Sequence, residues 1–331
     1  MDAGRSLGII GLGLVGRAFA ERARRMGWRV TGFDPSPVAT GVARAAGVEI
    51  RSDAAAVADG CGTVLVAVFD GPQLVRVADA LLRARRRPRL VLSCVTSDAA
   101  TAESVGRRLE AAAISFVDMP LSGSSQQIAA GEALAMAGAG DHAWSVARAV
   151  VAALAPRHVR VGAAGAGARA KLATNLVLGL NRAALAEGLA FAEALGLGGA
   201  TFLDLLRRSP AYSRAVDVAG PRMLTGAFTP VSRIAQHRKD VALILDAAAG
   251  AGLELTLERG HAALLDAAIA AGDGDLDNAA IIRIIRGRKP SSATEPDPCP
   301  PSTSRRRKAA SKRSRRKRPA RSRKPTGRSR G

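Results

Sequence analysis

The sequence predicts an α/β protein in which an N-terminal doubly wound parallel sheet is followed by an all-helical domain and a disordered basic tail. Residues 7–118 alternate short Val, Ile and Leu runs with helix-length segments, which is typical of a parallel sheet covered on both faces. Residues 168–271 show helical patterns only, and residues 301–331 carry 15 Lys and Arg without an Asp or Glu. We place the three parts at residues 1–164, 165–289 and 290–331.

The first βαβ unit carries the most specific motif in the chain. We expect a buried strand over residues 7–10, a helix to about Met26 and a second strand over 28–33. Gly11 permits the tight turn, Gly13 leaves no side chain in the path of a pyrophosphate, and Gly16 lets the helix pack closely on the strand. Phosphates would meet free N–H groups at the positive helix end, so a dinucleotide is the expected ligand. The predicted cofactor-binding residues here are Gly11, Leu12, Gly13, Leu14, Val15 and Gly16.

Asp34 ends the second strand and favours NAD over NADP. It lies 18 residues beyond Gly16, close to the offset at which an acid accepts hydrogen bonds from the adenosine ribose hydroxyls. The same carboxylate would repel a 2′-phosphate, and the residues that follow are Pro, Ser and Pro rather than Arg. We therefore expect a Rossmann domain that binds NAD.

The remaining elements follow from hydrophobic pattern and breaker residues. Gly71 and Pro72 start one helix, and the absence of proline from residues 168–195 allows a single long helix to open the second domain. The further predicted helices are 38–46, 54–58, 71–85, 99–113, 143–154, 201–208, 211–223, 232–251 and 255–271, and the further strands are 48–50, 63–69, 89–95, 115–118, 133–137 and 158–161.

Composition limits the compartment and the chemistry. Cys61, Cys94 and Cys299 are isolated, which argues against a disulfide framework and predicts no metal site. No apolar run approaches the ~18 residues that a membrane span needs, and the first strand leaves no room for a signal peptide. We expect a cytoplasmic protein without a membrane partner.

The formal net charge of +21 is concentrated in the tail. Residues 287–331 contribute +15 of it, and the rest of the chain is close to ordinary. Such a segment repels itself and has too few apolar residues to form a core, so we expect disorder beyond about residue 290. It could bind nucleic acid without reading sequence, which leaves open a nucleic-acid-associated protein that uses the α/β body as a scaffold or sensor.

Two further stretches carry candidate chemistry. Ser122 and Gly123 follow a strand end, where the carboxyl edge of a parallel sheet faces the ligand crevice and turn amides can bind a carboxylate. Lys171 and Asn175 lie four residues apart, on one face of the first turns of the long helix. A buried lysine titrates nearer neutrality and can exchange a proton with a substrate hydroxyl. Lys239 and the acid after it would by themselves be a solvated charge pair.

Together these motifs resemble the β-hydroxyacid dehydrogenase family, of the 3-hydroxyisobutyrate dehydrogenase type, over about residues 5–286. G-L-G-x-x-G, D-x-P-x-S-G, G-x-G-x-x-x-K-x-x-x-N and K-D occur in the family's order. The resemblance implies a dehydrogenase that exchanges hydride between NAD and a small 3-hydroxy acid. It further implies that Lys171 is the acid/base, assisted by Asn175.

The resemblance assigns the other site residues as well. It places Ser122 and Gly123 on the substrate carboxylate, with Ser124 where the family has a second glycine. It places Val68, Phe69 and Thr96 against the cofactor and brings Lys239 to the cleft. An imine reductase resembles the same family, but those proteins usually lack the lysine found here at 171. Because the long helices have apolar faces, we also expect a homodimer or homotetramer.

Overall fold

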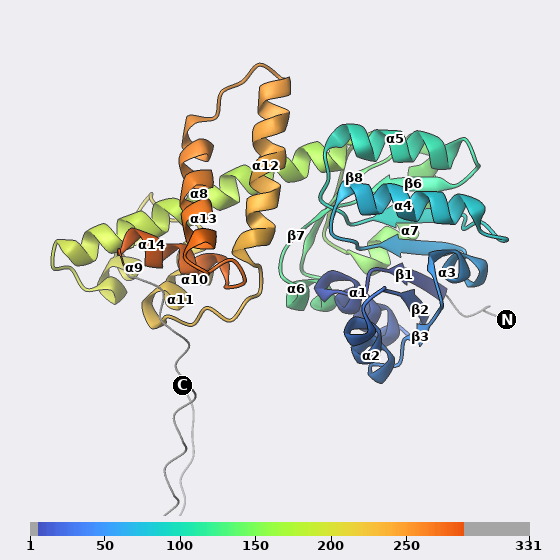
Figure 1. The fold of residues 1–331 in the computed structure, drawn as a ribbon, viewed down its shortest axis with the longest axis horizontal. Coiled ribbons are helices and arrows are strands. Elements are labelled where there is room, and N and C mark those ends of the chain that lie inside the picture. The colour runs from blue at the N-terminus through green and yellow to red at the C-terminus, as the bar shows by residue number, and fades with distance from the viewer. Residues whose placement is uncertain (1–5, 288–331) are drawn as a thin grey trace, which may run out of the picture. The chain divides into compact units, whose positions relative to one another are not determined.

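The computed structural model describes residues 6–287. The predicted disordered tail therefore lies outside the described residues. Residues 6–162 form a Rossmann domain around one sheet, with strands in the order β3-β2-β1-β4-β5-β6-β8-β7 and with β9 paired to β8 (Figure 1). Its strands are β1 (Ser6–Ile10), β2 (Arg29–Phe33), β3 (Glu49–Ile50), β4 (Thr63–Val66), β5 (Leu90–Ser93), β6 (Ser115–Asp118), β7 (Leu121–Ser122), β8 (Leu134–Gly138) and β9 (His158–Gly162).

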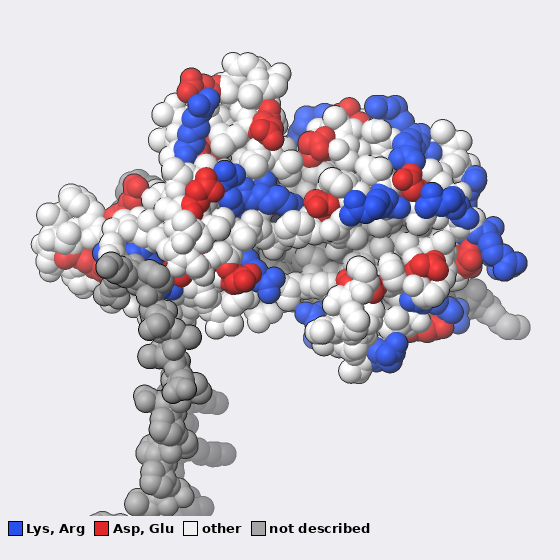
Figure 2. All heavy atoms as spheres, in the orientation of Figure 1, with Lys and Arg blue, Asp and Glu red and all other residues white. Residues whose placement is uncertain are grey.

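Helices cover both faces of the sheet, as the alternating pattern predicts. On one face, α3 (Ala54–Gly60), α4 (Gly71–Arg83) and α5 (Ala99–Glu110) bury side chains against the strands, and Leu74, Leu109 and Phe116 belong to that core. On the other face, α1 (Leu14–Arg25) and α7 (Asp141–Leu154) contribute Phe19 and Val151. The helix α2 (Pro37–Ala45) follows β2. Figure 2 shows Lys and Arg gathered over α4 and α5.

The strands predicted over residues 7–118 pair in parallel, as expected, but the sheet is mixed at one edge. β8 runs antiparallel to β6 and β7, and β7 and the helix α6 (Ser125–Ala130) are elements that the sequence did not predict. A parallel return needs a crossover of a dozen or more residues, and the connection from β7 to β8, residues 123–133 with α6 inside it, is shorter than that. The 14-residue helix α7 is long enough, and β9 accordingly pairs parallel to β8.

The second domain is all-helical, as predicted. Its long helix α8 (Ala166–Ala194) has 29 residues. The others are α9 (Gly199–Arg207), α10 (Ala215–Val218), α11 (Gly220–Thr225), α12 (Ile234–Gly250), α13 (Thr256–Ala270), η1 (Asn278–Ile281) and α14 (Ile282–Ile285). Their shared core includes Leu189, Met223, Val241, Leu265 and Ile282. Within residues 6–287, no helix is long and apolar enough to cross a membrane.

Two predictions in this domain are wrong in detail. The expected helix over 211–223 is divided into α10 and α11, because Gly220 and Pro221 interrupt it and Pro221 instead occupies the first turn of α11. The short elements η1 and α14 were not predicted, since four-residue helices leave no periodic pattern.

In the Rossmann domain, β4 ends at Val66, so Val68 and Phe69 lie in a loop rather than in the predicted strand.

Candidate active site

The glycine loop before α1 has the shape that a dinucleotide needs. Gly11 has a φ of +93°, and a Cβ there would lie 2.5 Å from the Ala67 carbonyl oxygen. A Cβ at Gly16 would lie 1.9 Å from the carbonyl oxygen of Gly11, so the helix can approach the strand only with glycine at this position. Gly13, by contrast, faces open space. No side chain caps α1 and no acid lies in its first turn, so its free N–H groups fit a pyrophosphate.

Asp34 holds the same loop from the end of β2. One carboxylate oxygen accepts a hydrogen bond from the Leu12 N–H at 2.8 Å, and the other accepts one from the Ser36 N–H at 2.8 Å. The carboxylate is therefore fixed beside the glycine loop by two backbone donors. Each oxygen keeps a lone pair for a further donor such as a ribose hydroxyl.

The start of α8 is attached to the sheet by a close backbone contact. A Cβ at Gly167 would lie 2.5 Å from the Asp118 carbonyl oxygen and 2.6 Å from that of Met136, so only glycine permits this approach. The Asp118 carboxylate, 1% exposed, accepts the Ala168 N–H at 2.7 Å and so caps a helix that begins at a glycine. Burial raises the pKa of Asp118 to about 6, against the lowering effect of the backbone donors.

Lys171 and Asn175 lie on the buried face of α8, together with Asp240 of α12. Asn175 Nδ2 donates to Asp240 Oδ2 at 3.1 Å. Lys171 is 9% exposed, and its ammonium has no hydrogen bond or ion pair within residues 6–287. Burial lowers the pKa of Lys171 to about 8, while the negative charge of Asp240 opposes the shift. A lysine with this pKa can both accept and donate a proton near neutral pH.

Lys239 joins α12 to two loops of the Rossmann domain. Its Nζ donates to the Phe69 carbonyl oxygen at 3.0 Å and to the Thr96 carbonyl oxygen at 3.2 Å. It also lies 3.2 Å from Asp240 Oδ1 and 4.9 Å from the centre of the Phe69 ring. These loops follow β4 and β5, at the carboxyl edge where ligands bind in such sheets. Thus the structure brings Lys239, Phe69 and Thr96 together with the Asp240–Asn175 pair.

The predicted carboxylate-binding loop has a conformation of its own, set by a glycine and a helix cap. Ser122 ends β7, and Gly123 has a φ of +150°, a conformation that favours glycine. Ser124 caps α6: its hydroxyl accepts the Gln127 N–H at 3.2 Å, and its own N–H donates to the Gln127 side chain at 2.9 Å. The described residues contain no hydrogen bond or ion pair between Ser122 or Gly123 and Lys171, so their joint action on one substrate stays a prediction.

Sequence reasoning missed the structural roles of Asp118 and Asp240. Asp240 was interpreted as half of a solvated charge pair, yet it is 9% exposed and joins Asn175 to Lys239. One signal was available: Asp240 and His237 fall on the same stripe of α12 as the buried residues Ile234, Val241 and Ile244. Polar residues on an apolar stripe are informative because they are seldom buried without a partner.

Comparisons with known proteins agree with this arrangement. Residues 6–162 match the NAD binding domain of 6-phosphogluconate dehydrogenase. Residues 165–285 match the family described as NAD-binding of NADP-dependent 3-hydroxyisobutyrate dehydrogenase. The L-threonate dehydrogenase of Cupriavidus necator is 32% identical over 86% of this chain and 97% of its own length. The chain belongs to the β-hydroxyacid dehydrogenase family.

Solved structures support the same relation. Mycobacterium tuberculosis 3-hydroxyisobutyrate dehydrogenase with L-serine has a TM-score of 0.78 at 29% identity, covering 86% of this chain and 99% of that one. The Salmonella typhimurium 3-hydroxyisobutyrate dehydrogenase has a TM-score of 0.75 at 26% identity, covering 85% and 99%. The Pseudomonas imine reductase shares 18% identity and a TM-score of 0.55, a likeness of fold alone. This β-hydroxyacid dehydrogenase is an NAD(P)-dependent oxidoreductase of the 3-hydroxyisobutyrate dehydrogenase type.

Proposed function

We propose that Lys171 is the acid/base with which this enzyme oxidises a small 3-hydroxy acid or reduces the matching semialdehyde or keto acid. The observation that carries the proposal is a buried ammonium with a pKa lowered to about 8 and no hydrogen-bond partner within residues 6–287. The neighbouring Asn175 amide is already oriented by Asp240. A hydroxyl placed between the two would receive one hydrogen bond and lose its proton to the lysine.

The roles divide between the chain and its cofactor. A bound nicotinamide dinucleotide supplies the hydride acceptor or donor. Lys171 takes the hydroxyl proton in oxidation and returns it in reduction, and Asn175 holds the substrate oxygen. Ser122 and Gly123 would fix the substrate carboxylate. Ser124 would bind the substrate carboxylate only by giving up its hydrogen bonds to Gln127. We therefore expect it to contribute less to substrate binding than Ser122 and Gly123.

The substrate is best identified by direct screening. We expect the full-length enzyme to reduce NAD with at least one of L-threonate, 3-hydroxyisobutyrate or L-serine, the compounds in the names of its relatives. The measurement is the absorbance of the reduced cofactor, with Lys171→Ala as the matched blank. Failure of every small hydroxy acid in the panel, with cofactor binding intact, would refute the assigned substrate class.

We further propose that NAD is preferred to NADP. The fixed Asp34 carboxylate would bind the ribose hydroxyls and repel a 2′-phosphate. The substitution Asp34→Asn should narrow the ratio of kcat/KM between the two cofactors, because it removes the negative charge and keeps the side chain's size. Since Asp34 also holds Leu12 and Ser36, the melting temperature of the variant must be measured beside its kinetics. Equal wild-type efficiency with both cofactors would contradict the proposal.

We also propose a homodimer or homotetramer assembled through the helical domain. Phe191 and Leu195 near the end of α8 are 66% and 70% exposed, and Leu205 of α9 is 52% exposed. Large apolar side chains left exposed in a helical domain commonly meet a second copy. Light scattering of the wild type should give a multiple of the 34.0 kDa chain mass, whereas a monomer at micromolar concentration would contradict the proposal.

A second activity is suggested by the tail. The 15 Lys and Arg of residues 301–331 would bind polyanions such as duplex DNA without sequence preference. This binding would coexist with catalysis, because every residue assigned to the cofactor or substrate precedes the tail.

A further inference from the structure

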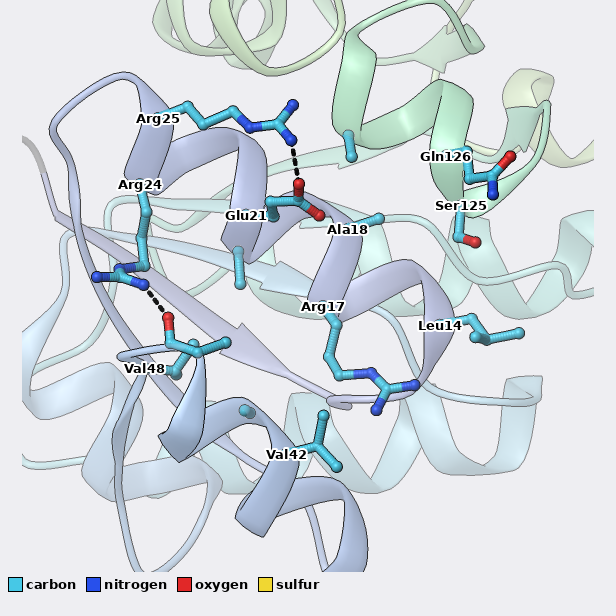
Figure 3. Close-up of a pocket in the computed structure, with 14 residues that line it drawn as sticks. Leu14, Arg17, Ala18, Glu21, Arg24, Arg25, Val42, Val48, Ser125 and Gln126 are labelled. Atoms are coloured by element: carbon cyan, nitrogen blue, oxygen red, sulfur yellow. Dashed lines mark hydrogen bonds and ion pairs between the residues drawn. The ribbon is translucent and has the colours of Figure 1, made fainter. Parts of the chain in front are cut away.

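A groove of about 680 Å³ lies between α1, α2 and α6 and shares Leu14 with the predicted cofactor loop (Figure 3). Its volume is within the range of pockets that hold small organic ligands. It is lined by the outward side of α1, including Leu14 and Arg17, by Val42 and Ala46 on the α2 side, and by Gln126 at the start of α6. Gly11, Gly13 and Lys171 do not line it.

The floor of this groove is apolar and incompletely covered. Leu14 and Val42 are 46% and 45% exposed, although both are large hydrophobic residues. Alanine is the most frequent lining residue, as at Ala18 and Ala46, and such short side chains leave a hollow between the helices. Partly exposed apolar surface inside a concave site is the usual lining for the hydrocarbon part of a ligand.

One cation at the groove lacks a partner. Arg25 is paired with Glu21, as a dashed line in Figure 3 shows, and Arg24 donates to the Ala46 carbonyl oxygen. Arg17 is half-buried beside the apolar floor and has no hydrogen bond or ion pair within residues 6–287. Its guanidinium thus offers five unused N–H donors, in a geometry that suits a carboxylate or a phosphate.

We propose that this groove binds an amphipathic organic anion, with its acidic head on Arg17 and its hydrocarbon chain on the apolar floor. The stretch of α1 from Leu14 to Arg25 is about 17 Å long at 1.5 Å per residue, which accommodates a medium-length chain. A carboxylate and a phosphate head share the same recognition by the guanidinium, and the two are separated by the test below. Lys171, Asn175, Ser122 and Gly123, which we propose act on the hydroxy acid, do not line the groove.

The test is calorimetric titration of the full-length enzyme at saturating NAD. The probes are octanoate and octyl phosphate, with 1-octanol and inorganic phosphate carrying the chain or the charge alone. We expect one of the two amphipathic anions to bind in a 1:1 ratio, at least tenfold more tightly than either partial probe. The more tightly bound of the two identifies the head group. Absence of binding by both would overturn the proposal.

Variants locate the binding. Arg17→Gln should weaken the affinity at least tenfold by removing the charge, and Val42→Asp should do so by placing a like charge on the floor. Arg44→Gln is the matched control. It removes one positive charge, as Arg17→Gln does, from an exposed position on α2, the helix that carries Val42, but outside the groove. The basic tail is common to all variants. Equal affinities of Arg17→Gln, Val42→Asp and wild type, or an equal loss in Arg44→Gln, would place the binding elsewhere and overturn the proposal.

Discussion

Burial disfavours the charged form of Lys171, whereas the proposed proton transfer needs a side chain that can carry that charge. Its ammonium is covered by protein yet pairs with no carboxylate at hydrogen-bond distance within the described residues, and its pKa falls to about 8. Burying an unpaired cation lowers the stability of the folded state, and packing alone gives no reason for a lysine at this position. The substitution of this one side chain should therefore affect turnover much more than cofactor binding.

We expect Lys171→Ala to lower kcat by about 10²- to 10⁴-fold, the usual contribution of positioned proton transfer, with the affinity for NAD nearly unchanged. A primary amine such as methylamine should restore part of the rate, because it can enter the vacated space and carry the proton. Steady-state kinetics with and without the amine make the measurement. A variant that retains more than about a third of wild-type kcat/KM would contradict the acid/base role.

The pH dependence should show the lowered pKa of Lys171 directly. In the oxidative direction the neutral amine must accept a proton, so kcat/KM should rise with pH and level off above about 8. In the reductive direction the protonated form is needed, so the rate should fall above about 8. The two profiles should be mirror images around the same midpoint. A midpoint near the ordinary lysine value of 10.5 in both directions would show that the titrating group is not this buried lysine.

At the scale of elements, the junction between β6 and α8 combines a buried acid with a helix start. The folded protein binds a proton on Asp118 more tightly than the unfolded chain does, because burial raises the pKa from 3.8 to about 6. The contribution of this group to stability is therefore fully present below about pH 4 and is lost as the pH rises through about 6. A shift of this size corresponds to about 3 kcal/mol.

The substitution Asp118→Asn tests this linkage. The amide oxygen can still accept the Ala168 N–H, but it carries no charge to desolvate. Denaturant unfolding at several pH values should show wild-type stability falling by up to about 3 kcal/mol relative to the variant between about pH 4 and 7. Asp98→Asn, which changes the cap of α5 on the same sheet, serves as a control. A wild-type-to-variant difference that does not change with pH would contradict the argument.

The same elements show what sequence could and could not predict. β6 was predicted at its observed bounds because Phe116 and Val117 follow a helix-length segment and Pro120 comes soon after them. The antiparallel edge was missed because β7 has two residues and α6 has six, too few for a period to be recognised. In the candidate site, Lys171 and Asn175 were singled out by their place at the start of the long helix and by the resemblance to the family. Asp240 was missed because the contact that buries it joins residues 65 positions apart.

For the whole molecule, catalysis and the basic tail should be separable. Truncation after Gly287 should change kcat and NAD affinity by no more than about twofold, since the cofactor and substrate residues all precede it. It should also abolish a DNA affinity that decreases steeply with salt. Binding to a duplex at two salt concentrations, alongside the kinetic assay, makes the comparison. Loss of dehydrogenase activity, or DNA binding unchanged by truncation, would show that the tail is not an independent module.

The hydrogen bond between Ala168 and Asp118 makes one backbone proton a reporter of the junction between the two folded parts. This amide can exchange with deuterated solvent only when the start of α8 separates from the sheet, so its exchange rate measures how often that separation occurs. Lys171 follows three residues later on the same helix, and its position relative to the sheet depends on the same contact. Slower exchange at Ala168 in the presence of NAD and substrate would mean that the bound ligands suppress this separation, and with it the displacement of Lys171 from the sheet.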